Sequence, residues 1–222
     1  MTASRTSGLL LHPTSLPGPP GIGDLGPAAD AFLDTLRDAE QSLWQVLPLG
    51  PTGYGDSPYQ MLSAFAGNPL LVSPQRLVDD GLLAADELPG VPRGDPARVD
   101  FGAVIPAKTR LLRTAGAAFR KGDGPADLRR EWDEFREREK HWLDGWTLFA
   151  ALHDREKKAW VEWPRELSRR EPDALAAARN ELSEEIEHGA FLQFLFFRQW
   201  DRLRARAAEA GVRLFGDLPL FV

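Results

Sequence analysis

Short apolar runs of strand length alternate with longer amphipathic segments near the start of this chain. The first run covers residues 8–12 and is followed by a proline, and the second covers residues 43–47. Between them, residues 27–40 begin with a proline and carry apolar side chains every three or four positions, which is typical of an amphipathic helix. A strand, a helix and a strand joined by short links predict a βαβ unit with parallel strands.

The middle of the chain changes from an irregular to a helical pattern. Residues 73–105 contain four prolines among polar and charged residues, so we expect loops with short helical turns there. From Pro106 the apolar spacing predicts helices. We expect a break at residues 122–125, a helix that reaches Leu143 and a further helix over residues 146–157.

The last part of the chain predicts a long helix and a third strand. A helical pattern runs from Pro172 to Ala210, and residues 190–197 within it are apolar on nearly every side, so this helix should be covered on more than one face. Gly211 ends the pattern, and residues 212–215 form a third apolar run. The element order predicts an α/β protein with two parallel strands, a mostly helical insertion, a packing helix and a third strand.

Composition narrows the functional class. The formal net charge is −6, which does not fit the basic surface of a nucleic-acid-binding protein. The chain has no cysteine, which excludes disulfides and thiol chemistry and fits a reducing compartment. His12 and Pro13 interrupt the first apolar run, unlike a secretory leader, and residues 190–197 are too short to cross a bilayer. We therefore expect a cytoplasmic protein that binds neither nucleic acid nor membrane.

The loop after the second apolar run carries the clearest candidate chemistry. Residues 50–58 contain three glycines and two prolines, so the backbone should be rigid but irregular. Tyr54 and Tyr59 lie in or beside this loop, with Asp56 and Ser57 between them. A buried strand that leads into such a loop predicts a ligand site. The four histidines have no metal-ligand spacing, so no metal site is expected.

Three stretches form an ordered pattern over the two ends of the chain. They are Leu11–Gly26 (L-H-P-T-S-L-P-G-P-P-G-I-G-D-L-G), Ser42–Leu71 and Gly216–Val222 (G-D-L-P-L-F-V), with weaker matches at Val99–Phe101, Glu162–Pro164 and Phe194–Trp200. This pattern closely resembles the N-terminal signature of the 4-alpha-glucanotransferases of glycoside hydrolase family 77, also called amylomaltases or disproportionating enzymes. The resemblance extends over the whole chain but covers only the front part of the family, whose members are roughly twice as long or more.

The resemblance implies a fold, an activity and a partner. The implied fold is the N-terminal part of a (β/α)8 TIM barrel, with about three strands and a mostly helical insertion. Residues 1–60 would hold the first two strands, the first helix and the substrate loop, residues 61–182 the insertion, and residues 183–222 the packing helix and third strand. The implied reaction transfers a segment of an α-1,4-glucan to another glucan or to glucose, with retention and without a cofactor. Maltooligosaccharides are the implied partners.

The resemblance also assigns substrate-binding roles to three residues. Asp217 matches a family aspartate that contacts sugar hydroxyls in the innermost donor subsite. From spacing alone, an aspartate that caps a loop or pairs with an arginine is an equal alternative. Tyr59 matches a tyrosine that stacks on the same sugar, and Ser57 matches a neighbouring hydroxyl contact. Tyr54 resembles a tyrosine of a second, non-catalytic glucan site. Its usual tyrosine companion is Phe101 here, which keeps the stacking face and loses the hydroxyl.

The family places its nucleophile, its acid/base and a third essential carboxylate after later strands. We therefore expect no catalytic residue in this chain and no activity of the 222-residue chain alone. His12, at the end of the first strand, either lines the site or is a satisfied structural histidine. The alternative functions are a non-catalytic glucan-binding module and, from the amphipathic middle, a helical interaction protein. Three parallel strands leave uncovered edges, so low stability or self-association through the open sheet is expected.

Overall fold

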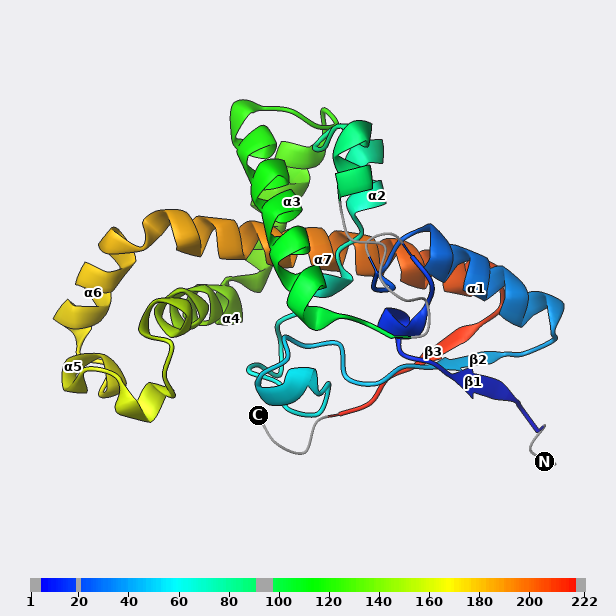
Figure 1. Ribbon diagram of the computed structural model, residues 1–222, viewed down its shortest axis with the longest axis horizontal. Coiled ribbons are helices and arrows are strands. Elements are labelled where there is room, and N and C mark those ends of the chain that lie inside the picture. Colours follow the sequence, from blue (N-terminus) through cyan, green and yellow to red (C-terminus); the bar gives the residue numbers. More distant parts are fainter. Residues whose placement is uncertain (1–4, 19–20, 91–97, 219–222) are drawn as a thin grey trace. The chain divides into compact units, whose positions relative to one another are not determined.

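The chain folds into two compact units (Figure 1). The structure is a computed structural model that describes residues 5–18, 21–90 and 98–218. Unit 1 comprises residues 1–126 and 195–222, and unit 2 comprises residues 127–194. The expected division into barrel part and helical insertion, at residues 61 and 183, stays a prediction.

Unit 1 is organised around a parallel sheet with the strand order β1-β2-β3. The strands are β1 (Gly8–Leu10), β2 (Leu43–Gln45) and β3 (Arg213–Phe215) (Figure 1). In the central strand, Trp44 pairs with Leu9 on one side and with Leu214 on the other. The three strands predicted from the apolar runs are therefore confirmed, each slightly shorter than its run.

Helix α1 (Pro27–Asp38) packs against the central strand. Leu33 on its apolar face is fully buried, and the Phe32 ring meets the Trp44 ring edge to face with centroids 4.9 Å apart. The Trp44 indole N–H donates a hydrogen bond to the Leu11 carbonyl oxygen at 2.8 Å. The helix predicted between the first two strands is therefore confirmed, and its packing fixes the end of β1.

The expectation of loops throughout residues 73–105 is wrong at both ends. Helix α2 (Pro74–Asp79) starts with its proline at the first position, where the missing N–H leaves nothing unpaired, so this proline begins a helix instead of preventing one. Helix α3 (Phe101–Lys121) begins one turn or more before Pro106. The Asp100 carboxylate caps it by accepting a hydrogen bond from the third helical N–H. Short 3-10 turns occupy η1 (Pro13–Ser15), η2 (Tyr54–Asp56), η3 (Pro69–Leu71) and η4 (Ala85–Gly90).

A buried lysine joins three segments of unit 1. Lys108 on α3 is fully buried, and its Nζ donates to Asp24 Oδ2 at 3.1 Å and to the Val72 carbonyl oxygen at 2.9 Å. A third hydrogen bond reaches the Leu70 carbonyl oxygen. Burial lowers the pKa of Lys108, and the charge of Asp24 opposes this effect. Three protons meet three acceptors, so this "Lys108 network" fixes the loop after β1 against α3.

Helix α7 (Ser183–Glu209) approaches the chain that follows β2. Gly67 is buried against the ring of Phe196, and a Cβ at position 67 would overlap that ring. The Gln199 side-chain amide accepts from the Ser73 N–H at 2.7 Å and donates to the Ser73 carbonyl oxygen at 3.3 Å. All these contacts lie within unit 1. The close approach of the Phe196 ring to the backbone requires a glycine at position 67.

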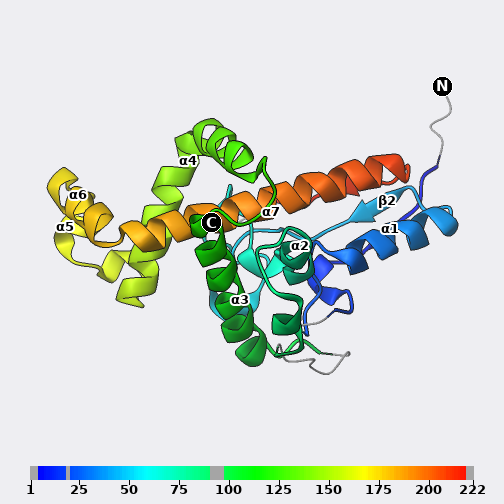
Figure 2. The ribbon, with the colours of Figure 1, turned by 90° about the horizontal axis from the view of Figure 1, so that it is seen from above.

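Unit 2 is helical and has a core of its own (Figure 2). Its elements are α4 (Leu128–Glu156), η5 (Trp160–Glu162), α5 (Arg165–Ser168), α6 (Pro172–Glu181) and the first part of α7. Leu148, Leu152, Trp163, Leu167 and Leu182 form the centre of the buried cluster. Of the helices within residues 61–182, where the insertion was expected, α4, α5 and α6 lie in unit 2, whereas α2 and α3 lie in unit 1.

Two helix boundaries in unit 2 differ from the expectation. Helix α4 continues through Gly145, where two separate helices were expected, because a glycine in an exposed helix interior costs only about 1 kcal/mol. The stretch from Pro172 to Ala210, predicted as one helix, consists of α6 and α7, which meet at Leu182. Neither glycine nor proline marks that break, and the buried Leu182 side chain packs into the core.

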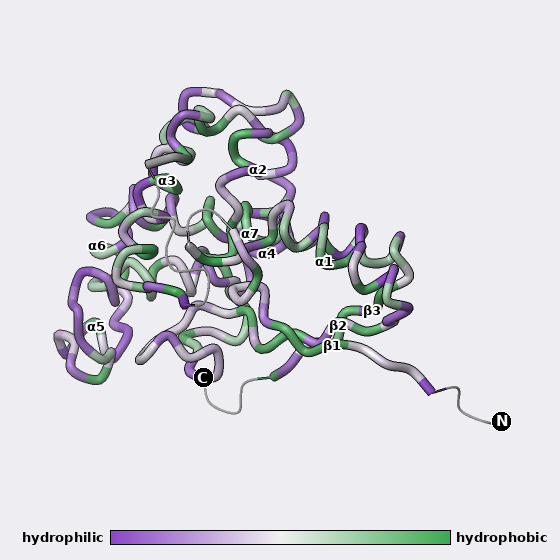
Figure 3. Tube along the Cα trace, turned by 45° about the vertical axis from the view of Figure 1, so that its right-hand side comes forward, coloured by the Kyte–Doolittle hydropathy of each residue, from purple (hydrophilic) through white to green (hydrophobic). Residues whose placement is uncertain are grey.

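The outer strands of the sheet are open to solvent. Leu9 and Leu10 in β1 are 47% and 57% exposed, and Phe215 in β3 is 58% exposed. Figure 3 shows hydrophobic colour along β1 and β2. Unpaired strand edges of this kind can pair with other chains. Within residues 5–18, 21–90 and 98–218, no helix combines the length and apolar character needed to cross a membrane.

Candidate functional site

The loop after β2, residues 50–62, closes on itself through backbone hydrogen bonds. Thr52 and Met61 form an antiparallel bridge, and the Gly53 N–H donates to the Gln60 carbonyl oxygen at 2.7 Å. These hydrogen bonds within the backbone therefore fix the conformation of the loop. We call residues 50–62 the β2 loop.

The β2 loop meets the end of β3 through two of the predicted site residues. The Tyr59 hydroxyl donates a hydrogen bond to Asp217 Oδ2 at 2.8 Å, and Asp217 Oδ1 accepts from the Leu218 N–H at 2.8 Å. Ser57 lies beside them, and its Oγ accepts from the Tyr59 N–H at 3.4 Å. The structure thus brings Tyr59, Ser57 and Asp217 together at the C-terminal ends of two neighbouring parallel strands, where β/α barrels carry their sites.

Tyr59 remains available to a ligand despite this hydrogen bond, because its side chain is 45% exposed. The hydrogen bond to Asp217 raises the pKa of Tyr59, and partial desolvation and the negative charge of Asp217 act in the same direction. At neutral pH the phenol is therefore a protonated donor beside an acceptor carboxylate. An exposed aromatic face next to such a pair can both stack on a ring and bind hydroxyl groups.

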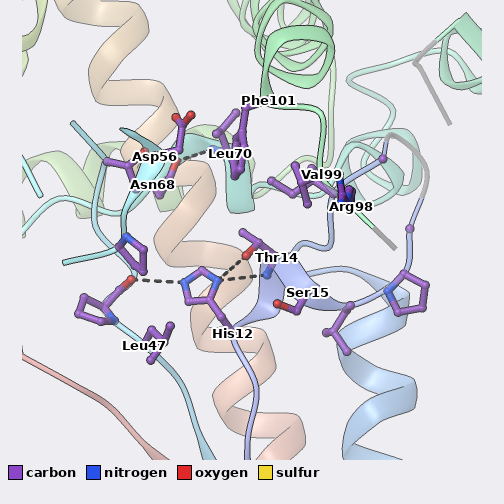
Figure 4. A pocket seen from close by; sticks show the side chains of 18 residues that line it. His12, Thr14, Ser15, Leu47, Asp56, Asn68, Leu70, Arg98, Val99 and Phe101 are labelled. Carbon is purple, nitrogen blue, oxygen red and sulfur yellow. Dashed lines mark hydrogen bonds between the residues drawn. The ribbon is translucent and has the colours of Figure 1, made fainter. Parts of the chain in front are cut away.

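A cavity of about 790 Å³ lies at the C-terminal ends of β1 and β2 (Figure 4). His12 and Thr14 line it from the loop after β1, and Leu47 and Asp56 line it from the chain after β2. Asp56 is the one carboxylate among the described lining residues. Since glycosyl transfer with retention needs two carboxyl groups about 5 Å apart, these lining residues do not supply that pair.

His12 is both a cavity residue and a satisfied histidine. Its Nδ1 lies 2.7 Å from Thr14 Oγ1 and accepts from the Thr14 N–H at 3.3 Å, while Nε2 lies 3.3 Å from the Pro48 carbonyl oxygen (Figure 4). Nε2 therefore carries the proton in this arrangement. Burial lowers the pKa of His12, and the hydrogen bond to Pro48 partly opposes this. The imidazole is neutral and holds the loop after β1 to the end of β2.

The two residues proposed for a second glucan site are only partly described. Phe101, the first residue of α3, lines the cavity together with Val99 (Figure 4). The side chain of Tyr54 lies outside the described residues, so the expected Tyr54–Phe101 pairing stays a prediction.

Sequence reasoning singled out neither Asn68 nor Arg98, whose polar side chains belong to the cavity wall. Asn68 also caps η3 by accepting from the Leu70 N–H at 2.9 Å, and an asparagine immediately before a proline was a usable signal for that role. Arg98 directly precedes the Val99–Phe101 motif, which was the signal available for it. Within the described ranges, which omit residues 19–20 and 91–97, no group of three or more His, Asp or Glu side chains could hold a metal ion.

Comparison with known proteins places the chain in one group. The sequence profile of the 4-alpha-glucanotransferase family, glycoside hydrolase family 77, matches residues 11–222. A 4-alpha-glucanotransferase of Thermus thermophilus is 48% identical over 100% of this chain and 44% of its own length. A chloroplastic/amyloplastic 4-alpha-glucanotransferase of Solanum tuberosum is 40% identical over 98% of this chain and 38% of its own length. The chain thus spans less than half the length of these relatives.

Solved structures agree with the sequence comparison. Amylomaltase from Streptococcus agalactiae, in complex with acarbose, superposes with a TM-score of 0.92 at 37% identity, over 98% of this chain and 44% of that chain. Amylomaltase from Corynebacterium glutamicum superposes with a TM-score of 0.64 at 19% identity, which supports the fold alone. The predicted fold class, an N-terminal part of a TIM barrel with a helical insertion, is thereby confirmed.

Proposed function

This chain belongs to the 4-alpha-glucanotransferase family, and on that premise we propose that its protein transfers a segment of an α-1,4-glucan to another glucan or to glucose. One observation carries the proposal beyond the family assignment. The Tyr59 hydroxyl and the Asp217 carboxylate meet at 2.8 Å where the chain leaves β2 and β3, with the Tyr59 face still exposed. Maltooligosaccharides are the substrates we propose for this pair, and no cofactor is required.

Each residue has a proposed role that follows from its chemistry. The ring of Tyr59 offers an apolar face to one sugar ring in the innermost donor subsite, at low entropic cost. The Asp217 carboxylate accepts hydrogen bonds from sugar hydroxyls, and the Tyr59 hydrogen bond orients it. Ser57 adds a hydroxyl contact beside Tyr59. In this proposal residues 1–222 position the glucan, and the carboxylates that make and break bonds belong to later barrel strands, so the 222-residue polypeptide alone does not disproportionate maltotriose.

A chimaera tests the proposal in a catalytic setting. Residues 1–222 would replace the matching segment of the T. thermophilus relative, and the product would be assayed for glucose and longer glucans formed from maltotriose. We expect transfer by the chimaera. Tyr59→Ala should lower kcat/KM roughly 100-fold, because a misplaced reacting sugar forfeits much of the benefit of orientation. Lys140→Ala, an exposed change in unit 2, should leave kcat/KM unchanged.

Two results would contradict the proposal. Full activity of the Tyr59→Ala and Asp217→Asn chimaeras would show that these two residues do not contribute to substrate binding. A folded chimaera that binds maltooligosaccharides without transferring them, beside an active parent relative, would favour the alternative of a non-catalytic glucan-binding module.

Two further parts of the proposal concern self-association and the location and partners of the protein. The exposed β1 and β3 residues support self-association through the open sheet, which light scattering at micromolar concentration would detect as a dimer or larger species. A monodisperse monomer would contradict it. The proposal includes a cytoplasmic location and no binding to nucleic acid or membrane, in line with the net charge of −6.

A further inference from the structure

Unit 2 contains a second cavity, of about 310 Å³, among α4, α5 and α6. Its walls are apolar, with Leu148 and Leu152 from α4, Leu167 from α5 and the buried ring of Trp163. Trp160 also lines it and is 55% exposed, so a large aromatic side chain is left in contact with water. Exposed apolar area at the mouth of a cavity is typical of a binding site.

Two arginines stand at this apolar cavity without partners. Among the residues that the structure describes, neither Arg170 nor Arg179 forms an ion pair or a side-chain hydrogen bond. Arg155, elsewhere in unit 2, shows the usual situation, since it pairs with Glu156 at 2.7 Å and with Glu181 at 2.9 Å. Both side chains are exposed to solvent, so the cavity combines an apolar interior with two accessible guanidinium groups that no carboxylate of the described residues pairs with.

Arg170 occupies a backbone conformation that glycine adopts more easily. Its φ is +59°, in the left-handed region, at the turn between α5 and α6. This conformation is a common way to end a helix: the Arg170 N–H donates to the Leu167 carbonyl oxygen at 3.0 Å and the Glu171 N–H donates to the Glu166 carbonyl oxygen at 2.9 Å, which closes α5. The cap sets the position of Arg170, one of the two cations at the cavity, directly after α5.

We propose that this cavity binds a small amphipathic acid, with an apolar body of roughly one aromatic ring and one carboxylate. The body fills the space between the leucines and stacks on the tryptophans, because a cavity of this size lies at the lower end of small-molecule sites. The carboxylate binds Arg170 and Arg179, whose planar guanidinium groups match it in charge and geometry. This ligand site is separate from the proposed glucan site and does not depend on it.

The lining chemistry favours this ligand over a sugar. A glucan unit needs hydrogen-bond acceptors as well as donors around its hydroxyls, and carboxylate or carboxamide side chains usually supply them. Among the residues that the structure describes, no Asp, Glu, Asn or Gln lines the cavity, and Ser168 supplies the one side-chain hydroxyl of the lining. Donors therefore dominate the side chains of the lining, which fits an anion better than a sugar.

The test compares two ligands of the same shape on the full 222-residue chain. The probes are 4-phenylbutyrate and the neutral 4-phenylbutan-1-ol, titrated by tryptophan fluorescence and by calorimetry. We expect the acid to bind with a Kd on the order of 0.1–1 mM and roughly tenfold more tightly than the alcohol. In the double variant Arg170→Gln/Arg179→Gln, the affinity for the acid should fall to that for the alcohol, while the affinity for the alcohol stays unchanged. Arg169→Gln, an adjacent exposed arginine that does not line the cavity, is the matched control.

A further variant tests the apolar part of the site. Trp160→Ala should weaken acid and alcohol by the same factor, because it removes area that both ligands bury. Equal affinity of acid and alcohol for the unmodified chain would overturn the proposal, and so would an acid affinity that the arginine changes leave intact. Tighter binding of maltotriose, lost in Trp160→Ala, would identify a glucan site instead. If circular dichroism shows that the double variant does not fold, the Arg179→Gln variant and the comparison of the two ligands on the unmodified chain still test the proposal.

Discussion

Unit 1 contains two side-chain contacts of nearly equal length that differ completely in burial. Lys108 meets Asp24 at 3.1 Å in a fully buried setting, and Tyr59 meets Asp217 at 2.8 Å with the tyrosine 45% exposed. Each contact joins residues far apart in the sequence, so distance along the chain does not tell them apart. The first has every proton on Nζ satisfied by protein, whereas the second leaves a ring face open. The difference shows that solvent access, rather than bond length, separates a contact that builds the fold from one that can meet a ligand.

The energetic consequences follow from desolvation. A buried charge without a partner costs several kcal/mol, so removing one member of the Lys108 network leaves a large penalty behind. Tyr59 and Asp217 can exchange their mutual hydrogen bond for bonds to water or to a sugar at little cost. We therefore expect substitutions at the two contacts to affect different properties of the protein.

The largest effect should come from Lys108→Met. This change leaves Asp24 buried without its cation and two carbonyl oxygens without a donor, so the free energy of unfolding should fall by about 3–5 kcal/mol. Urea denaturation followed by tryptophan fluorescence measures it. Lys140→Met, at an exposed pair with Glu137, should stay within about 0.5 kcal/mol of the unmodified chain. A change below about 1 kcal/mol for Lys108→Met would end the claim that this contact holds the fold together.

Glycine substitutions in the two loops sharpen the same contrast. A Cβ at Gly23, in the loop held by the Lys108 network, would overlap the Pro13 carbonyl oxygen, so Gly23→Ala should cost about 1–3 kcal/mol or prevent folding. Gly55 in the β2 loop has open space around it and a φ of +69°, so Gly55→Ala should cost only about 1 kcal/mol. Thermal melts of both variants would test the ranking, and the reverse order would show that the β2 loop is the less tolerant of the two.

Substitution at the exposed contact between Tyr59 and Asp217 should instead weaken the binding of glucans. The 222-residue chain should bind maltoheptaose weakly, with a Kd on the order of millimolar, because part of the site is built. Tyr59→Ala should remove this binding while the free energy of unfolding changes by less than about 0.5 kcal/mol. Tyr54→Ala should weaken binding less. Equal losses from both changes, measured by NMR titration, would mean that a second glucan site dominates.

The smallest expected effect is a shift in the titration of Tyr59. The chain has two tyrosines, so in a Tyr54→Phe background the absorbance change at alkaline pH reports Tyr59 alone. Its pKa should lie above the ordinary tyrosine value, because the hydrogen bond to Asp217 favours the protonated phenol. The contribution of this group to stability is then present at neutral pH and is lost as the pH rises through the raised pKa. Asp217→Asn should bring the titration midpoint down. An unchanged midpoint would show that the negative charge of Asp217 does not act on the Tyr59 hydroxyl in solution.

Much of unit 1 was predictable because its signals are local. The three apolar runs gave the strands, and the rule that barrel sites follow the strand ends selected four residues, which are Asp56, Ser57, Tyr59 and Asp217. To predict that these residues form one site, the family resemblance was needed as well, because an aspartate that follows a strand caps a loop just as often. The burial of Lys108 was not predicted, although the sequence contains a signal for it. It lies three and four positions before Leu111 and Leu112, on the apolar face of its helix, where a lysine must find acceptors.

The cavities and the exact helix boundaries were less accessible to sequence reasoning. The interruption at Leu182 and the continuity of α4 through Gly145 depend on tertiary packing, which outweighs propensities of about 1 kcal/mol. The unpaired state of Arg170 and Arg179 could not be read from a sequence in which positions 162–185 contain seven Asp or Glu residues. Charge composition gives the number of possible partners, and only the fold decides which of them are within reach.

The close approach of Gly67 and Phe196 has a consequence for how this segment can change during evolution. Because a Cβ at position 67 would occupy the space of the Phe196 ring, the two positions share one fixed volume. A relative with alanine or serine at the position of Gly67 should carry a smaller side chain at the position of Phe196, and each change made alone should be selected against. Gly67 precedes the β2 loop's anchor at Asn68, and Phe196 lies on the helix that leads to β3. Paired substitution at these two positions would therefore record selection on the spacing between the elements that carry Tyr59 and Asp217.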